Sequence, residues 1–255
     1  MRTRQAFGLG RLPNMLVLGV QRGGSTSLHS YLVQHPQIMG AIRQEVHYFD
    51  SNYWRGAGWY RAQFRDRPGK TIAFDNTPYY IFHPAAPQRV AETLGGAKFI
   101  VTLRNPVDRA ASQYWLSVSQ GHETLPFADA VAKESERLGN SEELLRSGAI
   151  QTHTAHRTNS YLSRGLYAQQ LRNWFQFHPR ENFLVLQSEK MFADPPATMA
   201  RVFDFLGLPP APLNAKALNK GKPEKMDPAL RAKLEEHFAA PNRELEALLG
   251  QKFDW

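Results

Sequence analysis

Two arginine-containing segments of this sequence have the residue types and spacing of phosphate-binding loops. The first is Gly19-Val-Gln-Arg-Gly-Gly-Ser-Thr-Ser-Leu28, which follows a run of apolar residues and precedes an amphipathic run. A glycine pair lets the backbone approach a ligand closely, and a helix N-terminus attracts anions. The residues that we expect to surround a phosphate supply a positive charge, backbone amides, hydroxyl donors and a helix cap, and they are Arg22, Gly23, Gly24, Ser25, Thr26 and Ser27.

This first loop leaves two interpretations open. An ordinary strand-to-helix turn with a Ser or Thr cap would use the same residue types. The loop also lacks the Gly-Lys-Ser/Thr ending of a Walker A motif, which disfavours an ATP-hydrolysing motor.

The second segment is Phe99-Ile-Val-Thr-Leu-Arg-Asn-Pro-Val-Asp-Arg-Ala-Ala-Ser112, and it also leads from an apolar run into a helical pattern. Arg104 stands at the end of the predicted strand, where ligands collect in open parallel sheets. Together with Ser112 it can hold a second phosphate; alternatively, Arg104 pairs with Asp108 or caps a neighbouring element. Two phosphate sites on neighbouring strand ends predict a nucleotide that carries phosphate at two positions.

Short apolar runs and helical periodicity predict the elements that must position these loops. Strands are expected at residues 15–20, 71–74, 98–103 and 182–187, and helices at 25–34, 84–94, 106–119, 126–138, 160–177, 195–206 and 228–249. The recurring order of strand and helix predicts an α/β protein. Its expected architecture is a P-loop-like three-layer sandwich, in which a central, mainly parallel sheet has helices on both faces.

A single domain over residues 1–255 is expected, because no repeat, low-complexity tract or linker interrupts the pattern. Residues 1–12 are expected to be a flexible N-terminal segment. Residues 207–227 are rich in Pro, Lys and Asn and predict a long ordered loop or flap.

The composition limits the classes of molecule that the protein is expected to bind. The chain has 31 Lys and Arg against 23 Asp and Glu, a formal net charge of +8, which favours anionic partners such as phosphorylated cofactors, acidic polymers, nucleic acid or a membrane surface. The absence of cysteine excludes disulfides, thiolate metal sites and cysteine nucleophiles and is compatible with a cytoplasmic location, which we expect. No apolar stretch approaches the ~20 residues of a membrane span, so no transmembrane segment is expected.

Taken together, these segments resemble the sulfotransferases that use 3′-phosphoadenosine 5′-phosphosulfate (PAPS). The first loop is similar to their 5′-phosphosulfate loop, and Leu-Arg-Asn-Pro-Val-Asp-Arg-Ala-Ala-Ser-Gln-Tyr is similar to their 3′-phosphate motif. Further segments resemble the heparan sulfate sulfotransferases, especially the 3-O type, and these are Gln44-Glu-Val-His-Tyr-Phe-Asp50, Gly58-Trp-Tyr60, Thr77-Pro-Tyr79 and the stretch from Pro241 to Trp255. The missing cysteine-bridged insertion of the animal enzymes indicates a bacterial-type relative.

The resemblance implies PAPS as the sulfuryl donor, adenosine 3′,5′-bisphosphate as the product, and no metal. It places residues 22–27 on the 5′-phosphosulfate, with Arg104 and Ser112 on the 3′-phosphate. Arg22 stands where these enzymes usually carry Lys, so a planar guanidinium replaces a compact ammonium and keeps the charge.

Two more donor contacts follow from the resemblance. The basic stretch Lys220, Gly221 and Lys222 is similar to a loop that closes over the nucleotide, although such a lysine cluster can also be a solvated charge run. Tyr167 is a candidate for the adenine pocket, and its alternative is a half-buried aromatic residue on a helix.

For catalysis, the resemblance assigns Glu45 as the general base, Arg22 as the group that stabilises the leaving phosphate and His47 as an assisting residue. An apolar setting among residues 46–49 is expected to make the Glu45 carboxylate more basic. Asp50 is expected to orient basic groups or bind acceptor hydroxyls. Two alternatives remain: His47 is itself the base, or Glu45 is only a surface carboxylate.

A metal site is not expected. His153 and His156 are three residues apart but lack a nearby carboxylate or thiolate partner, and we expect them on the surface of a loop or helix.

The acceptor side departs from the heparan sulfate enzymes. Asn76 and Thr26 stand where those enzymes carry basic residues, and with His47, Asp50 and Tyr79 we place Asn76 among the substrate-binding residues. Two missing cations each remove a charge-assisted bond of ~1.5–3 kcal/mol, so a heparan sulfate acceptor is disfavoured. The expected partner is another hydroxyl-bearing acceptor: a less acidic glycan, a glycolipid or a hydroxylated metabolite.

Two other functions use some of the same features. A nucleotide or small-molecule kinase would explain the phosphate loop, but it requires a Gly-Lys-Ser/Thr sequence and a magnesium-binding carboxylate, and neither is evident. A nucleic-acid-binding module would use the positive charge, but the basic residues are dispersed and no nucleic-acid motif is present, so no nucleic-acid partner is expected. The sequence does not indicate an oligomeric state.

Overall fold

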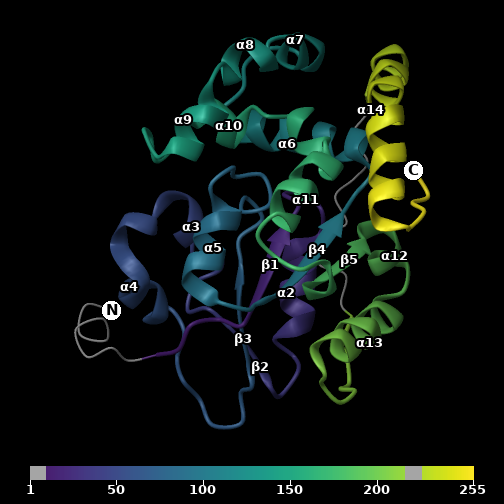
Figure 1. Cartoon of the computed structure of the whole chain (residues 1–255). Helices are drawn as coiled ribbons and strands as arrows, with labels where there is room; N and C mark the ends of the chain where they lie inside the picture. The colour runs from purple at the N-terminus through teal and green to yellow at the C-terminus, as the bar shows by residue number, and fades with distance from the viewer. Residues whose placement is uncertain (1–9, 216–225) are drawn as a thin grey trace.

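A five-stranded sheet forms the centre of this computed structural model, which describes residues 10–215 and 226–255. All neighbouring strands are parallel, and Figure 1 shows the arrowheads of β1, β4 and β5 directed toward the same end of the molecule. The predicted α/β class with a parallel sheet is therefore confirmed. In spatial order the strands are β2 (Ile38–Gly40), β3 (Ile72–Asn76), β1 (Met15–Gly19), β4 (Lys98–Leu103) and β5 (Phe183–Gln187).

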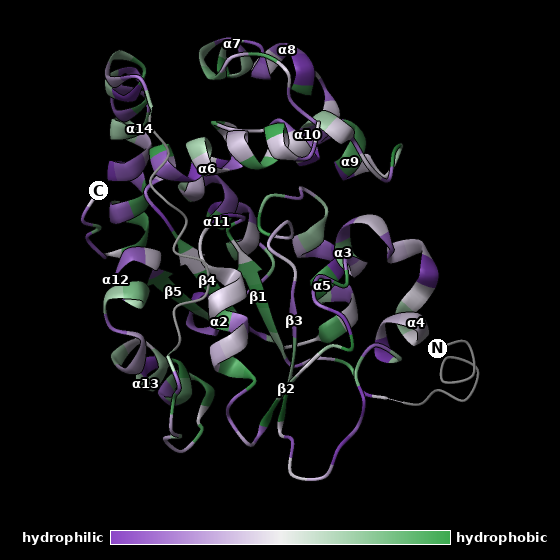
Figure 2. Cartoon of the chain, turned by 180° about the vertical axis from the view of Figure 1, so that it is seen from behind, coloured by the Kyte–Doolittle hydropathy of each residue, from purple (hydrophilic) through white to green (hydrophobic). Residues whose placement is uncertain are grey.

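Both faces of the sheet are covered by helices, because alternate strand residues belong to two separate buried clusters. On β1, Met15 and Val17 belong to one cluster, and Leu16 and Leu18 belong to the other; all four are fully buried. Figure 2 accordingly shows β1 in hydrophobic green. The first cluster includes side chains of α2 (Ser25–Leu32), α12 (Ser188–Ala193) and α13 (Pro195–Leu206), and the second includes side chains of α3 (Tyr48–Ser51), α4 (Gly56–Arg61), α5 (Ala86–Leu94), α11 (Tyr167–Phe175) and α14 (Pro228–Leu249).

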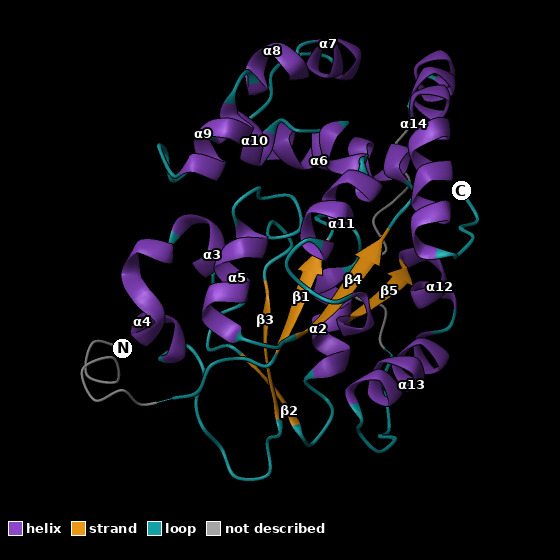
Figure 3. Ribbon diagram, viewed as in Figure 1, coloured by secondary structure: helices purple, strands orange, loops and turns teal. Residues whose placement is uncertain are grey.

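A group of helices lies beyond the carboxyl ends of the strands, at the side toward which the arrowheads point in Figure 3. They are α6 (Pro106–Ser119), α7 (Phe127–Ala132), α8 (Glu134–Leu138), α9 (Ser141–Ser147) and α10 (Thr154–Thr158). Single 3₁₀ turns occur at Tyr53–Arg55, Ser163–Gly165 and Arg180–Asn182.

The strand order places a topological switch at β1. The chain leaves β1 toward β2 and β3 on one side and then crosses back to β4 on the other side. Ligands of open α/β sheets bind at such a switch, outside the carboxyl ends of the strands. The loops after β1, β3 and β4 therefore meet at one place.

The structure differs from the predicted elements in several places, and the short helices α3, α4, α9, α10 and α12 were not predicted at all. Strand β2 was not predicted, because three residues are too few to show an alternating pattern. The helix expected at residues 126–138 is divided at Lys133 into α7 and α8, and the one expected at 160–177 begins only at Tyr167, after the 3₁₀ turn.

The N-terminal segment that we expected to be flexible falls partly outside the described residues, since 1–9 are not described. Its last residues make defined contacts: Arg11 donates hydrogen bonds to the carbonyls of Lys70 and Thr71, and Leu12 packs against the core. Arg11 and Leu12, which we expected in the flexible segment, thus have defined positions. The expectation of one domain over residues 1–255 stays a prediction.

Candidate functional site

The loop after β1 is built around its two glycines. A Cβ atom on Gly23 would lie 2.7 Å from the Thr102 carbonyl oxygen, and one on Gly24 would lie 2.7 Å from the Met191 side chain. Gly24 also has a φ of 88° and is the N-cap of α2, with no side-chain cap. The expected Ser or Thr cap is therefore wrong, because the chain turns at a left-handed glycine and the hydroxyl residues fall inside the helix.

Arg22 and Ser112, predicted on separate segments, are in contact. The Arg22 Nε donates a hydrogen bond to the Ser112 Oγ at 2.9 Å, and the Arg104 Nη1 donates one to the Arg22 carbonyl at 3.2 Å. Asp108 pairs with Arg231 of α14, so the alternative pairing of Arg104 with Asp108 is not observed. The two predicted phosphate-binding segments thus form one cationic site at the edge of the sheet.

Tyr167 is buried next to Arg104 of this site. It is 1% exposed, and its hydroxyl donates a hydrogen bond to the Arg104 carbonyl at 2.8 Å. The observed contact holds the Arg104 backbone in place, and the role in an adenine pocket stays a prediction. Lys220, Gly221 and Lys222 lie outside the described residues.

Glu45, His47 and Asp50 form a hydrogen-bonded chain that runs from the interior to the surface. The Asp50 Oδ2 lies 2.6 Å from the His47 Nδ1, and the His47 Nε2 lies 3.2 Å from the Glu45 Oε2. The exposed fraction of the side chain rises along this chain, from 0% for Asp50 to 16% for His47 and 51% for Glu45. The carboxylate predicted as the base is therefore open to solvent, and the expected apolar setting is wrong because its apolar sequence neighbours are buried in the core.

The two carboxylates change the proton affinity of His47. Burial by itself lowers the pKa of His47, but the hydrogen bonds to Asp50 and Glu45 outweigh burial and raise the pKa to about 9. Burial likewise raises the pKa of Asp50, and the bond to His47 reverses this effect, so that the pKa of Asp50 is lowered. The raised pKa favours the protonated form of His47 at neutral pH.

The backbone is unusual at the residues predicted to be catalytic. Within residues 10–215 and 226–255, the non-glycine residues with a positive φ are Arg22 at 69°, Glu45 at 55° and His47 at 54°. Such conformations are costly for residues with a Cβ, and they cluster at functional sites. The outliers therefore support the assignment of these three residues to one site.

Asn76, at the end of β3, connects the predicted base Glu45 to the loop after β1. Its side-chain amide donates a hydrogen bond to the Ser25 carbonyl at 3.1 Å, and its own carbonyl accepts one from the Glu45 amide at 3.2 Å. Asn76 is only 3% exposed. Its observed contacts are internal, and they place the predicted base Glu45 next to the loop after β1.

Comparison with known proteins identifies the family. A family model described as "Sulfotransferase domain" matches residues 12–240. This chain belongs to the sulfotransferase family. It is 32% identical to human heparan sulfate glucosamine 3-O-sulfotransferase 6, in an alignment that covers 97% of this chain and 75% of that protein. It is 26% identical to the membrane-associated sulfotransferase kil1 of Dictyostelium discoideum, covering 96% of this chain and 66% of that protein.

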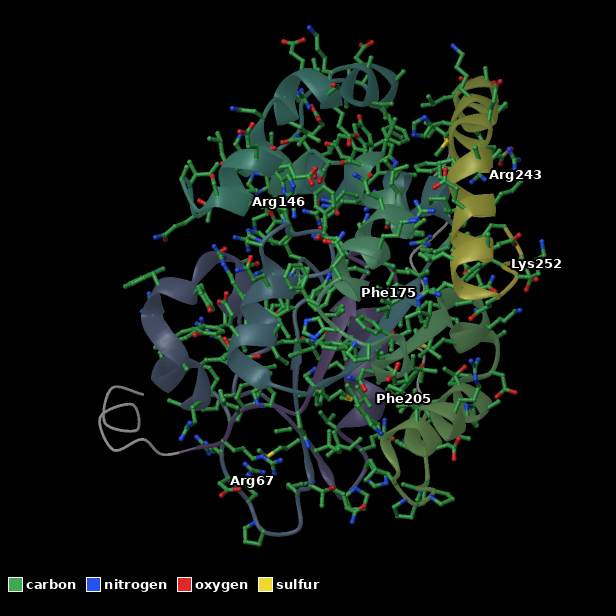
Figure 4. All side chains as sticks on the ribbon, viewed as in Figure 1. Arg67, Arg146, Phe175, Phe205, Arg243 and Lys252 are labelled. Carbon is green, nitrogen blue, oxygen red and sulfur yellow. The ribbon has the colours of Figure 1, made fainter. Side chains whose placement is uncertain are left out.

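A solved structure supports the same assignment. The sulfotransferase from Alicyclobacillus acidocaldarius superimposes with a TM-score of 0.79 at 28% identity, covering 94% of this chain and 97% of that chain. The predicted enzyme class, a sulfotransferase, and the predicted fold are confirmed. This assignment replaces both alternatives, a kinase and a nucleic-acid-binding module. In Figure 4, Arg67 and Arg146 lie apart from each other, and Arg243 and Lys252 lie on the side of the C-terminal helix α14.

The position of His156, which contacts Tyr79, differs from the prediction. His156 is 3% exposed, so its predicted surface position is wrong, and its Nδ1 lies 2.7 Å from the Tyr79 hydroxyl oxygen. Burial and then the charge of Arg164 lower the pKa of His156 to about 2, so the ring is neutral. Tyr79 is itself 7% exposed, and the Arg164 guanidinium lies 4.8 Å from the centre of its ring. The substrate contact of Tyr79 stays a prediction.

Arg157 of α10 is a site residue that the sequence did not reveal. Its Nη2 lies 3.2 Å from the His47 Nε2, across 110 residues of sequence, and no local motif marks it. The buried Arg164 holds it there, because Arg164 donates hydrogen bonds to the Arg157 carbonyl and to the Gln21 side chain of the donor loop. Arg157 thus adds a cation on the open side of the sulfotransferase site.

Two searches of the described residues gave no candidates. No helix within 10–215 or 226–255 is both long and apolar enough to span a membrane. In the same ranges, no three His, Asp or Glu side chains are arranged to hold a metal ion.

Proposed function

We propose that this sulfotransferase transfers a sulfuryl group from PAPS to a hydroxyl group of an acceptor, with Glu45 as the general base. The observation that carries the proposal is the exposed Glu45 carboxylate at the end of a chain from buried Asp50, next to the donor loop through Asn76. The position of a base beside a phosphate-binding loop supports direct transfer between two bound substrates.

The donor side fits a nucleotide with two phosphate groups. The N-terminus of α2 carries a partial positive charge, and it would attract the 5′-phosphosulfate. Arg104 and Ser112 would bind the 3′-phosphate, and Arg22 would neutralise the charge that develops on the leaving phosphate. The planar guanidinium of Arg22 can contact two oxygens at once, which suits this role.

The transfer itself balances without a further reactant. The acceptor hydroxyl gives its proton to Glu45 as its oxygen forms the new bond to sulfur. The bond between sulfur and the bridging oxygen breaks, and its electron pair leaves on adenosine 3′,5′-bisphosphate. His47, as an imidazolium, orients the Glu45 carboxylate through its Nε2 proton.

The pKa of His47 favours Glu45 over His47 as the base. With a pKa of about 9, His47 already carries its proton at neutral pH and cannot accept another. The Glu45 carboxylate is exposed and can approach an acceptor hydroxyl.

For the acceptor, we propose a hydroxyl-bearing glycan, glycolipid or metabolite that is less acidic than heparan sulfate. Asn76 is turned inward toward Ser25 and Thr26 carries no charge, so neither replaces the basic residues of the heparan sulfate enzymes. Arg157 is the one cation added near His47 among the described contacts of that ring. A cytoplasmic location stays a prediction.

The test is a transfer assay with radiolabelled PAPS and a panel of hydroxylated glycans, glycolipids and phenols. We expect label in at least one acceptor without added metal, and binding of adenosine 3′,5′-bisphosphate in the micromolar range, about −8 kcal/mol, with much weaker binding of AMP. Equal affinity for the two nucleotides would remove the role given to Arg104 and Ser112. A preference for highly sulfated heparan chains would contradict the proposed acceptor class.

A further inference from the structure

Asp75 is a buried carboxylate that the proposed reaction does not use. It lies in β3, is fully buried, and accepts hydrogen bonds from three hydroxyl groups. The Thr77 hydroxyl lies 2.8 Å from Oδ1, while the Tyr80 and Tyr60 hydroxyls lie 2.8 Å and 3.0 Å from Oδ2. Burying a carboxylate is unfavourable unless such bonds are present, so this site needs an explanation beyond packing.

Two of the three hydroxyls also contact the segment that carries the base. The Thr77 Oγ1 accepts a hydrogen bond from the His47 amide at 3.4 Å, and the Tyr80 hydroxyl accepts one from the Tyr48 amide at 2.6 Å. The Tyr60 hydroxyl has no such contact to that segment; its ring stacks on the Tyr48 ring at 4.2 Å. Through these two hydroxyls, Asp75 is connected to the backbone amides of His47 and Tyr48.

The direction of these bonds depends on the carboxylate. Burial raises the pKa of Asp75, and the hydrogen bonds from Thr77, Tyr80 and Tyr60 oppose this by stabilising the ionised carboxylate. A hydroxyl group has one proton, and an ionised carboxylate can only accept it. Because Thr77 and Tyr80 give their protons to Asp75, their lone pairs face the amides of His47 and Tyr48. Without the carboxylate, either hydroxyl can turn its proton toward a backbone amide, and two donors then face each other.

These hydrogen bonds hold a segment whose backbone conformation is unfavourable. Glu45 and His47 both have left-handed φ angles, which persist only when surrounding contacts hold them. The Glu45 amide is bound to the Asn76 carbonyl, so β3 and the residues that follow it bind the amides of Glu45, His47 and Tyr48.

We propose that Asp75 is a positioning residue for the general base. By fixing the hydroxyls of Thr77 and Tyr80, it holds residues 45–48 in the conformation that aims Glu45 at the acceptor and His47 at Glu45. The activity readout of this proposal rests on the proposed function, while the conformation that it describes does not.

The tyrosines provide a matched pair of variants. Tyr80→Phe and Tyr60→Phe each remove one buried hydroxyl from the same Asp75 oxygen, and both rings are fully buried. Only Tyr80→Phe also leaves the Tyr48 amide without its acceptor. If Asp75 merely stabilises the core, the two variants should lose activity equally.

We expect Tyr80→Phe to lower kcat about tenfold or more, while KM for the donor stays within about twofold and Tyr60→Phe keeps kcat within about twofold. Thr77→Ser keeps the hydroxyl and should retain activity, whereas Thr77→Val, of similar shape, should lose it. An equal loss in Tyr80→Phe and Tyr60→Phe would overturn the proposal, as would full activity of Thr77→Val.

A second readout does not depend on catalysis. In protein labelled at histidine nitrogen, the His47 ring signals, assigned by their loss in His47→Gln, report its titration and its bonds to Asp50 and Glu45. We expect the His47 titration to move to lower pH in Tyr80→Phe and to stay unchanged in Tyr60→Phe. If the parent transfers no sulfuryl group, the proposed function fails but this measurement still tests Asp75; an unchanged titration in Tyr80→Phe contradicts the role of Asp75.

Discussion

The donor side and the base side of this site are built in different ways. The donor loop is continuous in sequence, and its shape depends on glycines at positions where a Cβ would collide with Thr102 or Met191. The base segment contains no glycine: Glu45 and His47 adopt left-handed conformations that buried groups of β3 and the residues after it hold in place. The shape of the donor loop is thus set by its own glycines, whereas the shape of the base segment depends on support from other elements.

The two sides also differ in charge. Arg22 and Arg104 put positive charge beside the predicted phosphate positions, where Arg22 contacts the neutral Ser112 hydroxyl and Arg104 contacts the Arg22 carbonyl. On the base side, Asp50 and Glu45 enclose one imidazolium, and Arg157 approaches it from the open side. Substitutions on the donor side should therefore change binding, and those on the base side should change turnover and its pH dependence.

The largest expected effect is that of Glu45→Gln. The variant keeps size and hydrogen bonding but removes the basic carboxylate, so kcat should fall by about 10²–10⁴, the usual contribution of general-base catalysis. Affinity for adenosine 3′,5′-bisphosphate, measured by calorimetry, should stay close to that of the parent. Glu142→Gln, which removes an exposed partner of Arg146 on α9, serves as the control. Parental turnover in Glu45→Gln, with His47→Ala inactive, would establish His47 as the base.

Arg104→Ala tests the other side of the comparison. Loss of a charged contact to the 3′-phosphate should weaken binding of adenosine 3′,5′-bisphosphate by about 10- to 100-fold. Binding of AMP should change little, because AMP lacks that phosphate. Arg172→Ala, at an exposed pair with Glu244, is the control. A loss of folding, seen as a large fall in Tm, would instead support a structural role for Arg104.

Asp50→Asn should move the pH dependence without removing the base. Hydrogen bonds to Asp50 and Glu45 raise the pKa of His47 to about 9, so activity that needs the imidazolium should fall as the pH rises through about 9. This fall in activity is the alkaline limb of the pH profile. Without the Asp50 charge, the alkaline limb should move to lower pH. The same group stabilises the fold below its ordinary pKa of 6.5, and that stability is lost as the pH rises through about 9. An alkaline limb that stays in place would show that another group titrates.

Arg157→Gln should have the smallest effect on the pH dependence of activity, in the direction opposite to that of Asp50→Asn. The Arg157 charge lowers the pKa of His47, so its removal should move the alkaline limb slightly upward. The effect is small because Arg157 is exposed and its charge is screened by water and salt. Pairing this variant with Arg146→Gln, a distant exposed arginine, separates the local effect from a change in net charge. A downward movement would contradict the contact between Arg157 and His47.

Much of the fold was predictable because its signals are local. Strands β1, β4 and β5 each give a continuous apolar run, and the glycine pair marks the turn into α2. Strand β2 gave no comparable signal, since its pairing with β3 rather than its own pattern makes it a strand. The break at Lys133 has no proline or glycine to announce it.

From the sequence alone, two short motifs predicted the donor site, and the resemblance to the PAPS-dependent sulfotransferases predicted the three residues proposed for catalysis. Tertiary structure decided what surrounds them. The contact of Arg22 with Ser112, the approach of Arg157 to His47 and the link from Asp75 to the base segment each join residues that are distant in sequence or on different elements. No local pattern encodes such contacts, because they arise only when the parallel sheet brings the ends of β1, β3 and β4 to one edge.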